Sequence, residues 1–235
     1  VDSVLCRKLL KDGRQLYAAA KKEFIKERYA LQLIKTAFYA GRYQLVDSLY
    51  RSHYLPVKGG YSSVDSKVMG YYAGALYRSG KKAEAAYVFS RLFDESGDAS
   101  KAYSHTLGFV WAYSEGQLPE VIRLCRNSHE KAMVYALAAM RETEPYRMQS
   151  LQQIYQLEPD NPYLDVLLIR EINKVEQDFL EYKYNAQRGY WLYNAYYGDA
   201  RNKLNEDELK EWMDRINPAR KHLQEMSAFM ERTAG

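Results

Sequence analysis

The chain has 235 residues, of which 47% are apolar and 27% are charged, and its formal net charge is +4. These proportions are typical of a folded protein and exclude an intrinsically disordered one. No apolar run reaches the roughly 18–20 residues that a membrane-spanning helix needs, so we expect no transmembrane segment. Acidic residues are mixed with basic ones throughout, so we expect no nucleic acid as a partner, whereas the mild positive charge favours partners with acidic groups.

Residues 1–27 predict one or two helices, interrupted at Lys11-Asp12-Gly13. This segment is expected to be a helical cap or the end of a preceding repeat. The chain begins with Val1 and shows no signal peptide, so we expect a processed product or an excised segment of a longer protein.

Residues 28–182 predict a series of helix pairs. Turns containing Gly41, Gly80 and Gly116 each follow one helical stretch and precede another, and these glycines lie 39 and then 36 residues apart. One such pair cannot bury its apolar face alone, so a recurrence near this period is typical of a stacked α-solenoid. The expected pairs cover residues 28–50, 66–94, 102–126 and 130–157, and a fifth begins at residue 163.

Apolar residues at helical spacing support these pairs. The stripe expected to face the core in the second pair consists of Met69, Tyr72, Ala73 and Leu76. The corresponding residues of the third pair are Leu107, Phe109 and Trp111.

Residues 183–235 predict an aromatic-rich connector followed by closing helices. Asn205 and Glu208 have the spacing of a capping box, which opens a helix. Pro218 is expected to interrupt that helix, because proline lacks a backbone donor and clashes with the preceding turn. A last helix is then expected to run from Ala219 to roughly Arg232.

The whole pattern resembles the tetratricopeptide repeat. The resembling features are Gly41 with Tyr43 at a turn, Ala85 with Phe89 in a second helix, and the ending Leu157-Glu158-Pro159-Asp160-Asn161-Pro162. Residues 28–43 also look like segments of large exported bacterial tetratricopeptide proteins. The resemblance covers about residues 28–176. It implies an all-α, right-handed α-solenoid of about five helix pairs with C-terminal capping helices, located in a bacterial periplasm or cell envelope, or secreted.

Side chains with catalytic or metal-binding chemistry are scattered. The four histidines form no His-x-x-x-His pair, and the chain contains neither a Cys-x-x-Cys pair nor a phosphate-binding glycine loop. Cys6 and Cys125 have apolar neighbours in different predicted helices, which favours packed free thiols over a disulfide. We therefore expect no enzymatic activity, no cofactor and no metal.

The resemblance also implies a partner-binding face. In tetratricopeptide-like stacks the first helix of each pair lines the concave surface, and its non-core stripe contacts the partner. The stripe projected onto this chain consists of Arg28, Lys35, Tyr39, Lys67, Tyr77, Arg78, Tyr103 and Tyr113. Cations pair with carboxylates and tyrosines supply rigid amphipathic area, so this surface suits an extended peptide or an assembly partner with acidic groups. The alternative is solvated cations lying over tyrosines that pack between repeats.

A second aromatic group lies near the C-terminus, where seven Tyr and Trp residues fall between Tyr182 and Tyr197. If their rings are exposed, they can stack on a sugar, and the residues expected to do so are Tyr190, Trp191, Tyr193 and Tyr196. The helical spacing within this group also allows it to cover the open end of the array. The sequence thus predicts a non-enzymatic protein-interaction scaffold, with a glycan-binding module as the alternative.

Overall fold

The computed structural model describes residues 3–59, 63–97, 99–141, 148–176 and 206–233, and over these ranges the chain is all-α. It divides into two compact units, Val1–Ala138 and Ala139–Gly235. The first unit contains α1 (Ser3–Ala19), α2 (Glu23–Tyr39), α3 (Tyr43–Leu49), α4 (Ser63–Arg78), α5 (Lys82–Asp94), α6 (Ala99–Ala112), α7 (Leu118–Leu124) and most of α8 (Ser128–Arg141). The second contains α9 (Gln149–Leu157), a helix over 163–176, and α11 (Glu206–Thr233). No helix in the described ranges is long and apolar enough to cross a bilayer.

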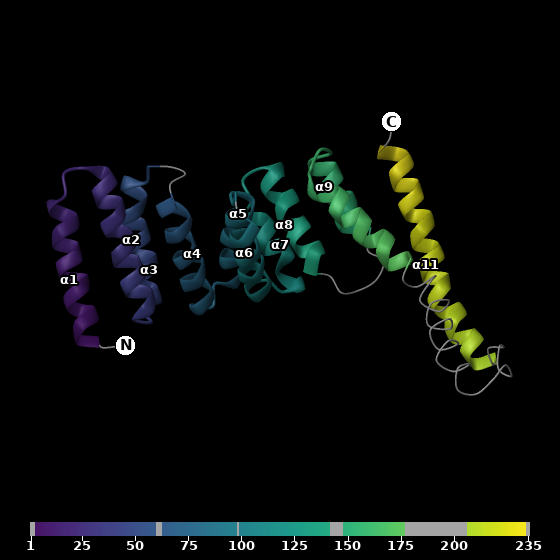
Figure 1. The fold of residues 1–235 in the computed structure, drawn as a ribbon, viewed down its shortest axis with the longest axis horizontal. Helices are drawn as coiled ribbons and strands as arrows, with labels where there is room; N and C mark the ends of the chain where they lie inside the picture. The colour runs from purple at the N-terminus through teal and green to yellow at the C-terminus, as the bar shows by residue number, and fades with distance from the viewer. Residues whose placement is uncertain (1–2, 60–62, 98, 142–147, 177–205, 234–235) are drawn as a thin grey trace, which may run out of the picture. The chain divides into compact units, whose positions relative to one another are not determined.

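Helices of the first unit pack on their neighbours in the chain (Figure 1). Helix α2 contacts α1, α3 and α4, while α5 contacts α4, α6 and α7. The core around α2 is built from small and branched apolar residues, among them Ala30, Ile34, Ala37, Val46 and Val68, each fully or almost fully buried. The all-α prediction and the predicted helices of these pairs are confirmed.

The turns after α2 and α4 share one backbone geometry. Gly41 and Gly80 have φ of 70° and 80°, a left-handed conformation that glycine adopts without steric cost. After α2, the amides of Gly41 and Arg42 donate to the carbonyls of Phe38 and Ala37, at 3.0 and 2.9 Å. After α4, the amides of Gly80 and Lys81 donate in the same pattern, at 3.1 and 3.0 Å. Both are Schellman turns, which satisfy the last carbonyls of a helix and aim the chain into the next one.

The third predicted turn is different. Gly116 lies in the short 3₁₀ segment η3 (Glu115–Gln117), and its φ is not positive. The helix that follows, α7, has Pro119 in its first turn, where the missing amide donor is unneeded. The two Schellman turns are therefore the repeated element. The Gly116 turn also connects two helices, α6 and α7, but does so through a 3₁₀ segment.

The expected break at Lys11-Asp12-Gly13 is wrong, because α1 continues through these residues. A Cβ at Gly13 would lie 2.8 Å from Cδ2 of Leu33, which is itself almost fully buried. Gly13 thus provides the space in which Leu33 of α2 packs against α1. Its function is close helix approach rather than a turn.

The expected break at Pro218 is also wrong, since α11 is continuous with this proline inside it. Residues after Pro218 are held by packing in the second unit: Ala219 and Met226 are fully buried, and the ring of Phe229 meets that of Tyr155 at 5.6 Å. These contacts stabilise the helix beyond the position where proline removes a hydrogen bond. Asn205, the predicted N-cap, lies outside the described residues.

A polar cluster is buried between the end of α3 and the start of α4. The chain leaves α3 through a π-helical turn, η1 (Tyr50–Tyr54), and a 3₁₀ turn, η2 (Leu55–Val57). The hydroxyl of the fully buried Tyr54 donates to the carboxylate of Asp65, which also pairs with Nζ of Lys58 at 3.0 Å. Burial, reinforced by this hydrogen bond, raises the pKa of Tyr54 far above its ordinary value, so its hydroxyl stays protonated.

Candidate functional site

Two of the predicted partner-binding helices, α2 and α4, lie against each other in the first unit. Lys35 and Tyr39 are four residues apart on α2, and Lys67 and Tyr71 are four residues apart on α4. Residues at this spacing share one face of a helix. We call these four residues, with Arg78 two turns beyond Tyr71 on the same stripe of α4, the tyrosine–cation face.

The two helices meet on this face at the pair Tyr39 and Tyr71. Their rings are 5.8 Å apart at an interplanar angle of 71°, an edge-to-face arrangement that aromatic pairs prefer. Their hydroxyls lie 3.5 Å apart. Partial burial and the Tyr39 hydroxyl together raise the pKa of Tyr71 to about 12, so the Tyr71 hydroxyl keeps its proton and can donate to a bound acceptor at neutral pH.

Phe38 holds this pair in place from beneath. Its ring lies 5.3 Å from that of Tyr71 and 5.8 Å from that of Tyr39. The ring fits against Gly74 of α4, where a Cβ would come within 3.0 Å of Phe38 Cε2. The glycine therefore lets Phe38 enter the helix interface, and the tyrosines above it are supported by a packed ring.

The side chains of the face remain accessible. Tyr39 is 57% exposed although it touches two aromatic neighbours. Lys35, Lys67 and Arg78 are exposed, and Tyr71 is half-buried. A large aromatic residue that is more than half exposed and also fixed by neighbouring rings provides contact area with little loss of conformational entropy on binding.

The first helices of the three pairs carry an unbalanced positive charge. Helix α2 has no acidic residue after Glu27, α4 has none after Asp65, and α6 has none at all. Glu27 and Asp65 are both buried, and each is engaged: Glu27 pairs with Arg28 at 3.8 Å, and Asp65 pairs with Lys58. One exposed acid, Glu23, lies in the first turn of α2, about four turns before Tyr39, and other exposed acids lie on other helices, for example Glu84 of α5 and Glu120 of α7. The tyrosine–cation face is thus locally positive, although the net charge of the chain is small.

Arg28 is not part of this face. Its guanidinium lies over the ring of Phe24, 3.3 Å from the centroid, and donates to the Phe24 carbonyl at 3.0 Å. These contacts turn the side chain toward the start of α2, away from Tyr39 near the other end of the helix. Tyr77 is half-buried on α4.

In the third pair the structure rearranges the predicted residues. Tyr113 is only 6% exposed, and its ring stacks on Phe109 at 5.0 Å, so it belongs to the core and does not offer a ring to a partner. Trp111, expected in the core, is 66% exposed, as is Tyr103. Tyr103 and Trp111 lie on the same broad side of α6, because eight residues correspond to little more than two turns. Trp111 was expected to be buried and Tyr113 exposed, and the structure shows the reverse.

Tyr71 belongs to this face but was not predicted from the sequence. The spacing of Lys67 and Tyr71 on α4 equals that of Lys35 and Tyr39 on α2, and this repeated pattern could have identified Tyr71. The alternative aromatic surface, Tyr190, Trp191, Tyr193 and Tyr196, lies outside the described residues.

Potential metal ligands do not gather in the part of the chain that the structure describes. No group of three His, Cys, Asp or Glu side chains there could hold a metal ion. Cys6 and Cys125 are free thiols, and burial raises the pKa of Cys125 to about 11, which keeps it as the unreactive thiol. Comparisons with models of protein families, with curated proteins and with solved structures found no match for this chain.

Proposed function

We propose that this chain is a non-enzymatic interaction protein whose tyrosine–cation face holds an extended peptide, or a segment of an assembly partner, that carries acidic side chains. The observation on which the proposal rests is the Tyr39–Tyr71 pair, in which Tyr39 is exposed and Tyr71 half-buried. The pair is supported by Phe38 and flanked on each helix by a lysine one turn away. Arginine and lysine pair with carboxylates, while the tyrosine hydroxyls donate hydrogen bonds and the rings provide apolar area.

The proposal includes the finer architecture, a right-handed tetratricopeptide-like solenoid. The two Schellman turns support it, because Gly41 and Gly80 recur 39 residues apart with the same hydrogen-bond pattern. Packing of each helix on its neighbours in the chain supports it as well. In such a stack the equivalent first helices present a continuous surface, which suits an extended ligand.

A binding experiment with defined peptides tests this function. The probe is a fluorescein-labelled peptide of about twelve residues in which Glu alternates with Ser and Leu, and its counterpart carries Gln in place of Glu. Fluorescence anisotropy at low salt is expected to show saturable binding of the Glu peptide only. The double charge reversal Lys35→Glu with Lys67→Glu is expected to weaken binding about tenfold or more, and Tyr39→Ala by a similar factor.

The matched control is Lys21→Glu with Lys22→Glu, which changes the net charge equally at exposed positions between α1 and α2. It should bind the Glu peptide nearly as well as the native chain. If both double variants weaken peptide binding equally, the loss follows from net charge alone, and the proposal of a specific binding face is contradicted. A saturable response to soluble polysaccharide that Trp191→Ala abolishes would favour the glycan alternative instead.

A further inference from the structure

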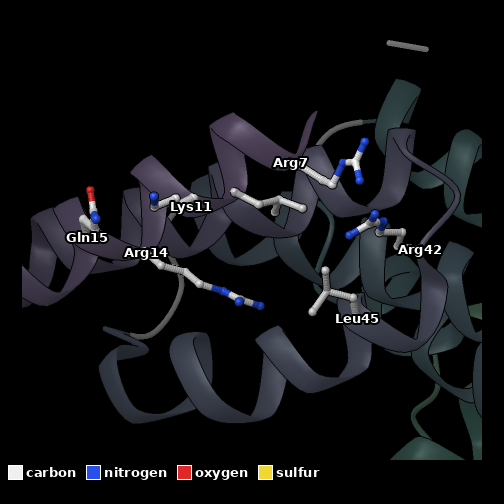
Figure 2. Close-up of a pocket in the computed structure, with 7 residues that line it drawn as sticks. Arg7, Lys11, Arg14, Gln15, Arg42 and Leu45 are labelled. Atoms are coloured by element: carbon white, nitrogen blue, oxygen red, sulfur yellow. The ribbon is translucent and has the colours of Figure 1, made fainter. Parts of the chain in front are cut away.

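A second cationic site, independent of the tyrosine–cation face, lies between α1 and the start of α3 (Figure 2). It is a pocket of about 340 Å³. Its lining consists of Arg7, Leu10, Lys11, Arg14, Gln15, Arg42 and Leu45. Four of these seven residues are cations, and none of the seven carries a carboxylate, so cationic side chains make up most of the polar lining.

Helix α1 supplies most of the charge because of its register. Arg7, Lys11 and Arg14 follow one another at spacings of four and three residues, which places them on one face of the helix. Leu10 lies among them on the same face and is only 5% exposed. The cations therefore stand around a buried apolar residue, which forms part of the floor of the pocket.

Arg42 closes the pocket from the other element, and its backbone is fixed. It is the residue after Gly41 in the first Schellman turn, where its amide donates to the Ala37 carbonyl at 2.9 Å. Its own carbonyl accepts from the Val46 amide at 3.1 Å, within the first turn of α3. In Figure 2 the side chains of Arg14 and Arg42 reach toward the same space, which Leu45 borders.

We propose that this pocket binds a phosphate monoester group. Arg14, Arg42 and Lys11 alone supply two guanidinium groups and one ammonium, more positive charge than a single carboxylate needs. A phosphate dianion has three terminal oxygens, so it can accept hydrogen bonds from several guanidinium forks at once. The volume lies at the lower end of the range of small-ligand sites, which fits one phosphorylated group together with a few attached atoms.

The first test measures phosphate binding directly. Calorimetric titration of the native chain with O-phosphoserine, at constant ionic strength, is expected to show a single saturable event, whereas serine and sodium chloride give none. The double variant Arg14→Gln with Arg42→Gln is expected to weaken that binding about tenfold or more. Arg14→Lys with Arg42→Lys keeps the charge and removes the forks, so binding should be intermediate.

The matched control is Lys21→Gln with Lys22→Gln, which removes two exposed charges outside the pocket lining. It should bind O-phosphoserine as the native chain does. Unfolding midpoints of all variants in the absence of ligand establish that each is folded. Absence of binding by the native chain, or equal weakening by the pocket and control variants, would overturn the proposal.

A second arm identifies the source of the phosphate. A peptide with one phosphoserine among neutral residues is compared with O-phosphoserine and with the same peptide lacking the phosphate. Tighter binding of the phosphopeptide indicates that the group is carried by a polypeptide, and equal binding indicates a small molecule. Lys35→Glu with Lys67→Glu should leave binding of O-phosphoserine unchanged, so failure of this site and failure of the tyrosine–cation face can be told apart.

Discussion

Phe89 of α5 occupies the space that a side chain on Gly108 of α6 would fill. A Cβ at Gly108 would lie 2.5 Å from Phe89 Cε1 and 2.6 Å from its Cδ1, closer than non-bonded atoms approach. Phe38 and Gly74 form a similar ring-to-glycine contact between α2 and α4, with a closest distance of 3.0 Å. Two interfaces of the first unit thus use the same device, in which a glycine inside one helix admits a phenylalanine ring from another.

Gly108→Ala is therefore expected to lower the free energy of unfolding by about 1 kcal/mol. Alanine favours the helix by up to about 1 kcal/mol, but overpacking against Phe89 costs about 1–3 kcal/mol. The matched control is Gly70→Ala in α4, where a Cβ meets nothing within 4 Å, and this variant should gain about 0.5–1 kcal/mol. Urea unfolding followed by circular dichroism measures both. Stabilisation by Gly108→Ala comparable to that of Gly70→Ala would contradict the ring-to-glycine contact.

The Schellman turns make a separate prediction. Gly41→Ala and Gly80→Ala are each expected to cost about 1–2 kcal/mol, because φ at both positions is positive and a Cβ strains that conformation. Neither substitution meets an atom within 4 Å, so the loss would come from the backbone alone. Gly116→Ala should be close to neutral, since Gly116 has neither a positive φ nor a neighbour within 4 Å. Equal losses at all three positions would argue against the difference between the turns.

Tyr54→Phe is expected to destabilise the protein by about 1–3 kcal/mol. The substitution removes the hydroxyl that donates to Asp65, which is only 6% exposed and keeps its ion pair with Lys58. Tyr39→Phe is the control, because it removes a hydroxyl from an exposed side chain and should change the free energy of unfolding by less than about 0.5 kcal/mol. Similar unfolding midpoints for the two variants would show that the buried hydrogen bond contributes little.

Stability should fall as the pH falls through about 6.5, the ordinary pKa of histidine. In the second unit, His222 is 2% exposed, and burial lowers its pKa, with a smaller lowering from Lys174 and opposing effects from Glu171 and Glu225. The unfolded chain therefore binds the proton more tightly than the folded one. The free energy of unfolding is highest at pH values above the ordinary pKa of histidine and decreases as the pH falls below it. The pKa values of His53 and His105 are lowered in the same direction, chiefly by burial.

Urea midpoints at pH 7.5 and 5.5 measure this dependence. His222→Gln should reduce the difference between the two pH values, and Lys221→Gln, an exposed neighbour on α11, should leave it unchanged. The ion pair between Nε2 of His222 and Oε2 of Glu171, at 3.2 Å, acts in the opposite sense. Stability that rises toward pH 5.5 in the native chain, and no longer does so in His222→Gln, would mean that this pair outweighs burial.

Much of the fold could be read from the sequence because it depends on residues close together in the chain. The helices follow from apolar spacing, and the turns at Gly41 and Gly80 follow from a motif that spans one helix end. The face was found in part for the same reason: Lys35 and Tyr39, like Lys67 and Arg78, occupy one stripe of one helix.

Other features depended on which helix covers which face, and only the tertiary structure decided them. Gly13 and Pro218 are residues that usually interrupt a helix. Leu33 packs against Gly13 within a continuous α1, and packing contacts in the second unit stabilise α11 beyond Pro218. Trp111 of α6 is exposed, whereas Tyr113, directly after the end of α6, is buried, because neighbouring residues pack over one and leave the other open. The Tyr39–Tyr71 pair and the pocket between α1 and α3 bring together residues from separate helices, and spacing within a single helix does not encode such pairings.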